Sequence, residues 1–166
     1  MIMIIKRDMI STLPIEKRDA ILKEFDKIFP KGMKWNGANI KRCKSFDLVS
    51  IFTHLNLPPS YDTRKASCES PHLALFYAMY VDKCPRDDTR MAASKRCGYA
   101  YLYAKFVDKE PNDITRVGAC QTPLYSYFYA MYVDKFPRDD TSEMAHKDPE
   151  LGRIYDRMLK GENNEG

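Results

Sequence analysis

Two stretches of this sequence are nearly identical: FYAMYVDKCPRDDT at residues 76–89 and FYAMYVDKFPRDDT at residues 128–141. They match at 13 of 14 positions and lie 52 residues apart. A more divergent copy, LYAKFVDKEPNDIT at residues 102–115, stands halfway between them. The basic period is therefore 26 residues, and the closer match at 52 suggests that a block of two units was duplicated recently.

The 26-residue step holds at many positions, and no gap interrupts it. The recurring sets are Thr63, Thr89, Thr115 and Thr141; Tyr77, Tyr103, Tyr129 and Tyr155; Val81, Val107 and Val133; Asp82, Asp108 and Asp134; Lys83, Lys109 and Lys135; and Pro85, Pro111 and Pro137. A fixed period of this length is the sequence signature of a repeat architecture.

Each unit contains the start and stop signals of two helices. Asp87 is an N-cap candidate for a short first helix over about residues 88–95, because its carboxylate can accept hydrogen bonds from free backbone N–H groups. Pro71 suits the first position of a second helix over about residues 71–83. This helix must end before Pro85, since proline disfavours the helical conformation in the residue ahead of it.

The predicted fold is all-α: an α-solenoid of about four 26-residue two-helix repeats with an N-terminal helical cap. Terminal units of such an array are atypical, because each covers one exposed side. The expected divisions are a basic helical cap at 1–36, an array at 37–160 and a disordered tail at 161–166. Within the array we expect a degenerate unit at 37–62, full units at 63–88, 89–114 and 115–140, and a truncated unit at 141–160.

The N-terminal part predicts one further helix, over about residues 14–29, with Thr12 as its cap candidate. Residues 31–39, KGMKWNGAN, contain two glycines and are interpreted as a loop. The segment that begins at Ser45, SFDLVSIFTHL, is interpreted as the second helix of the degenerate unit.

The repeat predicts a buried stripe on each second helix and a series of aspartate–arginine ion pairs, here called the ladder. Each second helix presents two small residues, a tyrosine and a valine on one stripe, and the buried tyrosine hydroxyls should find hydrogen-bond partners. The three repeated aspartates should pair with three repeated arginines, because half-buried carboxylates need such partners. Each of Asp82, Asp108 and Asp134 is expected to meet one of Arg64, Arg90 and Arg116, from the first helix of its own or of an adjoining unit.

A second set of residues lies off the core stripe and forms the candidate binding surface: Leu75, Met79, Tyr101, Lys105, Tyr127 and Met131. One interpretation is that these side chains are sandwiched between neighbouring helices. The other is that part of the set is exposed, in which case its Tyr and Met residues are typical of protein interfaces.

Charge separates two classes of partner. Residues 1–60 carry 11 Lys and Arg against 6 Asp and Glu, whereas residues 61–166 carry 16 against 17. An array that contacts phosphates repeatedly should be basic along one face, so its near neutrality favours a protein partner. The alternative is a nucleic-acid-binding protein. It would use Lys17, Lys23, Lys27, Lys31 and Lys34 together with Arg86, Arg90, Lys105, Lys109 and Arg138.

No catalytic motif is present in the sequence: there is no phosphate-binding glycine loop, no GxSxG and no metal-ligand spacing among His54, His72 and His146. We therefore expect no enzyme activity, no cofactor and no metal. The five cysteines include no CxxC pair and are expected to be reduced. The apolar run at residues 1–5 is too short for a signal peptide or a membrane span, which predicts a cytoplasmic protein without a membrane partner.

The consensus D-T-R-x-A-A followed by P-x-x-A-x-x-Y-A-x-x-V-D-K-x-P-R-D resembles the short helical repeats of bacteriophage proteins, and is similar in logic to HEAT-like and leucine-rich-variant arrays. The resemblance covers about residues 63–150 and carries no activity. It implies a scaffold that binds another macromolecule. The function we expect is a non-enzymatic protein-interaction module, for example a phage-encoded inhibitor or modulator of a host protein complex such as an anti-defence protein. Assembly into a homo-oligomer is also compatible with the sequence.

Overall fold

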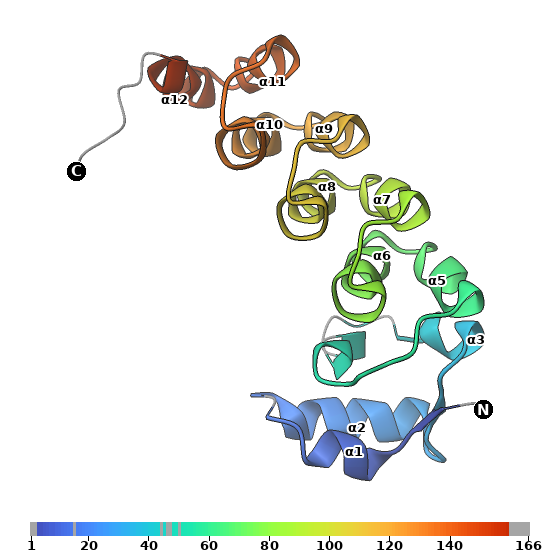
Figure 1. Ribbon diagram of the computed structural model, residues 1–166. Coiled ribbons are helices and arrows are strands. Elements are labelled where there is room, and N and C mark those ends of the chain that lie inside the picture. Colours follow the sequence, from blue (N-terminus) through green and yellow to red (C-terminus); the bar gives the residue numbers. More distant parts are fainter. Residues whose placement is uncertain (1–2, 15, 44, 46–47, 50, 160–166) are drawn as a thin grey trace.

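The computed structural model describes residues 3–14, 16–43, 45, 48–49 and 51–159, and it is mostly helical (Figure 1). The N-terminal part contains β1 (Ile4–Ile5), α1 (Arg7–Ser11), α2 (Arg18–Ile28), β2 (Met33–Lys34), α3 (Gly37–Ile40) and the short 3-10 helix η1 (Ile51–Thr53). Strands β1 and β2 pair antiparallel, with Ile4 opposite Lys34 and Ile5 opposite Met33. The expected disordered tail at 161–166 lies outside the described residues.

Three expectations for the N-terminal part are corrected by the structure. The expected helix over about 14–29 is present as α2, but it starts only at Arg18, after the separate helix α1. Thr12 is the C-cap residue of α1 rather than the N-cap of α2, and its hydroxyl donates backward to the Met9 carbonyl at 3.2 Å. The expected loop at 31–39 contains β2 and the start of α3, where the Asn36 side chain accepts the Asn39 N–H at 3.0 Å.

From Tyr61 onward the structure consists of helix pairs. The first helices are α5 (Tyr61–Ser67), α7 (Asp87–Ala93), α9 (Asp113–Ala119) and α11 (Asp139–Ala145). The second helices are α6 (Pro71–Phe76), α8 (Cys97–Tyr103), α10 (Pro123–Tyr129) and α12 (Pro149–Leu159). Their starting residues lie 26 positions apart, and the described part of 63–159 contains no strand. In Figure 1 the first helices follow one another along the right side and the second helices along the left.

Three of the second helices continue into a wider π-helical turn. These turns are η2 (Tyr77–Asp82), η3 (Ala104–Asp108) and η4 (Ala130–Asp134). Each is followed by a lysine in the left-handed conformation: Lys83, Lys109 and Lys135 have φ angles of 55°, 59° and 62°. The second helices thus stop ahead of the repeated prolines, as predicted, and a left-handed residue of the kind usually supplied by glycine reverses the chain.

A buried tyrosine in each second helix fixes the start of its own first helix. Tyr77 Oη lies 2.6 Å from Thr63 Oγ1 and accepts the backbone N–H of Ser60, the N-cap residue of α5, at 3.0 Å. The same two contacts recur in the next three pairs, through Tyr103, Tyr129 and Tyr155, at 2.6–2.8 Å and 3.0 Å. All four tyrosines are fully buried, and the prediction that their hydroxyls find partners is confirmed.

The predicted ladder of ion pairs is also confirmed, and each pair joins the two helices of one unit. Asp82 accepts from Arg64 at 2.7 and 2.8 Å. Asp108 accepts from Arg90 at 2.8 and 3.1 Å, and Asp134 from Arg116 at 2.7 and 3.2 Å. The carboxylates are at most 2% exposed.

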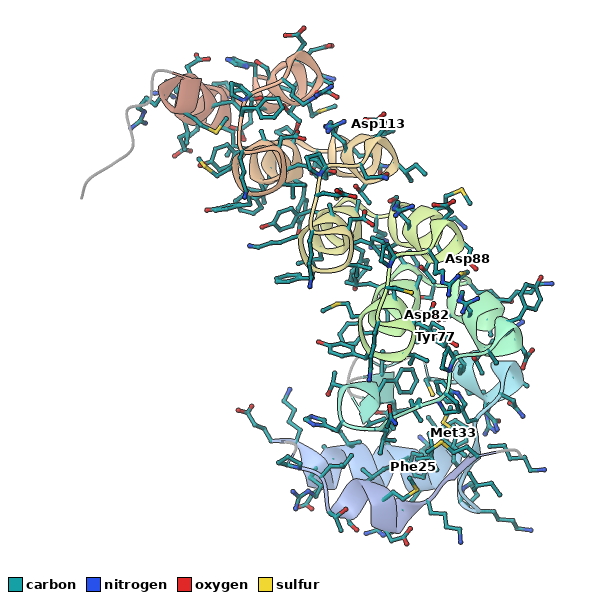
Figure 2. The ribbon with its side chains drawn as sticks, in the orientation of Figure 1. Phe25, Met33, Tyr77, Asp82, Asp88 and Asp113 are labelled. Atoms are coloured by element: carbon teal, nitrogen blue, oxygen red, sulfur yellow. The ribbon has the colours of Figure 1, made fainter. Side chains whose placement is uncertain are left out.

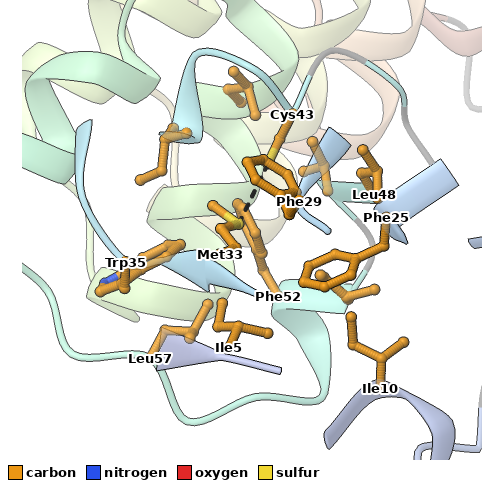
Figure 3. Packing of buried hydrophobic residues seen from close by; sticks show 14 of the residues in the cluster. Ile5, Ile10, Phe25, Phe29, Met33, Trp35, Cys43, Leu48, Phe52 and Leu57 are labelled. Atoms are coloured by element: carbon orange, nitrogen blue, oxygen red, sulfur yellow. Dashed lines mark hydrogen bonds between the residues drawn. The ribbon is translucent and has the colours of Figure 1, made fainter. Parts of the chain in front are cut away.

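The N-terminal core is continuous with the first helix pair. Figure 3 shows Phe25, Phe29, Met33 and Phe52 among its side chains, and the same cluster includes Tyr77 and Val81 of the first pair. Trp35 stacks on Tyr77 with ring centroids 6.3 Å apart and donates its indole N–H to the Pro58 carbonyl at 2.8 Å. Smaller clusters of Ala, Tyr and Val join the later pairs to one another.

Candidate protein-interaction surface

The six residues predicted to form a binding surface do not share one environment. Leu75 is 2% exposed and packs with Ala92 and Ala93 of the next first helix, and Tyr101 is 8% exposed. Both are interior residues, so an exposed position for them is ruled out. Lys105 is exposed, while Met79, Tyr127 and Met131 are half-buried.

The outermost aromatic side chains of the second helices stand at a position that the sequence analysis did not single out. Phe106 is 48% exposed and Tyr132 is 52% exposed, whereas Tyr80, one unit earlier, is half-buried. These three residues lie 26 positions apart. An aromatic side chain that recurs at this step was the available signal. Ideal helical spacing does not predict the exposure of Phe106 and Tyr132, because both lie in π-helical turns.

Lys105 lies among the aromatic side chains of two neighbouring units. Its Nζ is 5.4, 5.5 and 4.8 Å from the ring centroids of Tyr101, Phe106 and Tyr132, and it donates to Tyr101 Oη at 3.0 Å. Methionines 79 and 131 occupy the equivalent positions one unit away on either side. A cation held over ring faces in this way keeps a defined position while its ammonium group stays accessible to solvent.

We define the second-helix face as the exposed and half-buried side chains Met79, Tyr80, Lys83, Lys105, Phe106, Lys109, Tyr127, Met131, Tyr132 and Lys135. Within the three second-helix segments its cations have no exposed acid beside them, although the exposed Glu110 directly follows Lys109. The acids of residues 71–83, 97–109 and 123–135 are Asp82, Asp108 and Asp134, all of which are buried in their arginine pairs. In Figure 2 side chains project from these helices on the side away from the first helices.

A pocket of about 260 Å³ opens on this face between the first and second helix pairs. Its lining includes Met79, Lys83, Phe106 and Lys109. The two lysines come from equivalent left-handed positions of neighbouring units, so the pocket carries positive charge from both sides and an aromatic ring within it.

The opposite face of the helix pairs carries a different surface. A shallow groove of about 570 Å³ lies between α7 and α9, and its lining includes Met91, Ile114 and Val117, which are 54%, 39% and 70% exposed. Lys95 and Asp113 also line it. This first-helix groove is apolar with one charge of each sign, in contrast to the cationic and aromatic second-helix face.

The residues proposed for nucleic-acid binding fall into two groups. Lys17, Lys23, Lys27, Lys31 and Lys34 are exposed on the N-terminal part, and Arg86, Lys105, Lys109 and Arg138 are exposed on the helix pairs. Arg90 is different, because it is 12% exposed and engaged by both Asp108 and Asp87. It is therefore committed to the ladder rather than free to bind a phosphate.

Reactive side chains in the described part of the chain do not gather into a site. No group of three or more His, Cys, Asp or Glu there is arranged to hold a metal ion. The five cysteines are free thiols, and burial raises the pKa of Cys43 to about 12 and that of Cys68 to about 11. Thiols with pKa values this high are poor nucleophiles at neutral pH.

Comparison with known proteins found no matching family model, no matching curated protein and no matching solved structure. Among the described residues, no helix combines the length and the apolar character needed to cross a membrane. Functional inference therefore rests on the surfaces described above.

Proposed function

We propose that the protein is an α-solenoid of 26-residue two-helix units that acts as a non-enzymatic protein-interaction module. Its partner is another protein, bound on the second-helix face. The observation that carries this proposal is the position of Phe106 and Tyr132, two large aromatic side chains about half exposed on neighbouring units around Lys105. Aromatic residues and methionine are enriched at protein interfaces, and interface aromatics often dominate the binding energy.

The resemblance of the repeat to those of bacteriophage proteins directs the biological proposal. We propose a phage-encoded inhibitor or modulator of a host protein complex in the host cytoplasm, for example an anti-defence protein. Stacked helix pairs suit this role because they present a long surface without requiring a catalytic centre.

A nucleic-acid-binding protein is the second candidate, supported by the exposed lysines of the N-terminal part. Phosphate contacts would give affinity that falls steeply with salt, since bound counterions are released from the nucleic acid. Protein binding is preferred because the helix pairs as a whole are close to neutral and the exposed cations of the second-helix face are interleaved with apolar rings.

The test is affinity capture from host-cell lysate, with and without nuclease, using the intact chain and two double variants. Phe106→Ala with Tyr132→Ala alters the second-helix face, and Met91→Ala with Val117→Ala is the matched change in the first-helix groove. All four residues are at least 48% exposed, so the fold should tolerate either pair, and circular dichroism checks this.

We expect a partner that survives nuclease treatment, is captured by the intact chain and by the groove variant, and is lost with the second-helix variant. Loss with the groove variant alone would move the binding site to the first helices. A partner that is lost after nuclease treatment would refute this proposal and support nucleic-acid binding instead.

A further inference from the structure

The second-helix face presents lysines that form no ion pair within the described part of the chain. Lys83 and Lys109 flank the 260 Å³ pocket, and Lys105 lies one helical turn before Lys109. Of the acids next to these lysines in the sequence, Asp82 and Asp108 are 1% and 2% exposed and paired with arginines. Glu110, which follows Lys109, is exposed, but among the described residues it forms no ion pair with any of the three lysines. A ligand that covered this face would have to match three ammonium groups, because burying an unpaired charge is strongly unfavourable.

From this charge pattern we infer that the partner binds through an acidic segment of polypeptide, in which Asp or Glu side chains alternate with apolar ones. This inference rests on the proposed function and specifies the chemistry of the partner. One carboxylate enters the pocket between Lys83 and Lys109, and another meets the ammonium group of Lys105. Apolar side chains of the segment cover Met79, Phe106 and Tyr132.

The Lys105 side chain is already held in position for contact with a carboxylate. Three rings surround its ammonium group within 5.5 Å, so its side chain loses less conformational freedom on binding than a free surface lysine does. The rings satisfy little of its hydrogen-bonding capacity: Tyr101 Oη takes one of three N–H donors. A carboxylate can accept from the others.

Single-stranded nucleic acid would also combine stacking with positive charge, but the ring geometry favours a peptide. Bases stack on free ring faces. Here Phe128 is surrounded by Tyr101, Tyr125, Tyr127 and Tyr132, with centroids 5.8–6.0 Å apart. Aromatic side chains packed against one another leave edges and apolar patches, which suit aliphatic side chains better than stacked bases.

The structure supplies substitutions that remove the charges without straining the backbone. Lys83→Asn and Lys109→Asn place asparagine at left-handed positions, a conformation that asparagine tolerates better than most residues. Lys105→Met introduces the residue that the neighbouring units carry at the equivalent positions 79 and 131. As a control, Lys95→Asn with Lys147→Asn removes two exposed charges from the turns between first and second helices.

The experiment selects a yeast-displayed library of random 16-residue peptides against the purified intact chain and measures the affinity of enriched peptides. We expect enrichment of Asp and Glu beside apolar residues. Affinity should fall about tenfold or more in Lys83→Asn with Lys109→Asn and in Lys105→Met, and stay within about twofold in the control. It should also weaken as salt is raised.

Three results would overturn the inference: no acidic enrichment, peptides that bind the lysine variants as well as the intact chain, or tight binding of a 20-nucleotide oligothymidine that the same variants abolish. After either of the first two results, the Phe106→Ala and Tyr132→Ala variants still test whether this face binds protein. If selected peptides ignore the lysines but are lost with Phe106→Ala and Tyr132→Ala, the face binds protein without acidic recognition. If they ignore both sets of variants, this face is not the binding surface, and the proposed function fails with it.

Discussion

Replacing Asp134 by Ala should reveal how much the ladder of buried ion pairs contributes to stability. The Asp134 carboxylate is fully buried and accepts two N–H groups of Arg116, whose side chain is only 6% exposed. Removing one partner of a buried pair typically costs about 3–5 kcal/mol, because the other charge stays buried and unpaired. Here Arg116 keeps its contact with the exposed Asp113 at 2.5 Å, so we expect a loss at the lower end, about 3 kcal/mol.

The measurement is urea unfolding followed by far-ultraviolet circular dichroism, which reports all the helices, and by fluorescence of the single tryptophan, Trp35, which reports the N-terminal core. If the two signals diverge, the helix pairs unfold in more than one step and each transition must be fitted separately. Asp113→Ala is the matched control, since its carboxylate is 93% exposed and its loss should change little.

A double variant tests whether the stability lost in Asp134→Ala comes from the unpaired charge of Arg116. Adding Arg116→Met to Asp134→Ala removes the unpaired guanidinium and should restore more than half of the lost stability. The reasoning would be refuted by a loss below about 1 kcal/mol in the single variant, or by a double variant that is no more stable than the single one.

Three further outcomes are expected. Tyr103→Phe removes the hydroxyl that accepts the Arg86 N–H and should lower the free energy of unfolding by about 2 kcal/mol in the same urea assay; an unchanged value would mean that water replaces it. Gly118→Ala usually strengthens a helix but should destabilise here, because its Cβ would lie 2.6 Å from the Ser94 carbonyl oxygen; a rise in the urea midpoint would contradict this packing. Burial raises the pKa of Cys43 from 9.0 to about 12, so the stability that its protonated thiol contributes is complete below pH 9 and is lost as pH rises toward 12. Unfolding measured at pH 8, 9 and 10 should therefore show a shallower decline for Cys43→Ala, and parallel declines would exclude the thiol as the cause.

Most boundaries of the helix pairs were predictable because their local signals are repeated. The N-cap assigned to Asp87 is wrong, since Asp87 is the first residue of α7 and Arg86 is its N-cap residue. Pro71 and Pro85 bracket the second helix of one pair, and the same signals recur at 26-residue intervals. The kind of partner that Asp82 needs could be predicted as well, since a buried carboxylate requires a cation and arginine recurs with the same step. That the arginine is Arg64 of the same unit is known only from the structure. Periodicity thus turned weak local signals into reliable ones.

The N-terminal part could not be predicted in the same way, because its signals occur once. The Thr12 hydroxyl can cap a following helix or bond backward to the preceding turn, and sequence alone does not distinguish these uses. The β1–β2 pair depends on contacts between residues about 30 positions apart, and each strand has only two residues. No alternating apolar pattern is long enough to mark such strands.

The candidate surface was only partly predictable for a geometric reason. Leu75 and Tyr101 precede the π-helical turns and are buried by the neighbouring helix pair, whereas Phe106 lies within such a turn, which departs from ideal helical spacing. Both a sandwiched and an exposed set were open from the sequence: Lys105 is exposed, whereas Tyr101, four residues earlier, is covered by the next pair. Phe106 is exposed instead, at a position where an aromatic side chain recurs every 26 residues.

The hydrogen bonds of the buried tyrosine hydroxyls and the arginine–aspartate pairs determine where the molecule can bend. Both join helices within one pair, whereas neighbouring pairs meet through alanine, tyrosine and valine side chains, which slide past one another more easily than hydrogen-bonded groups do. At the α10–α11 joint Ser126 donates to the Thr141 carbonyl at 2.9 Å, while Ala74 and Ala100 stand at the equivalent positions and have no such group. Each helix pair should therefore move as a rigid unit, and bending should occur at the contacts between pairs. Of the three contacts between successive pairs, the one that includes Ser126 should be the least flexible.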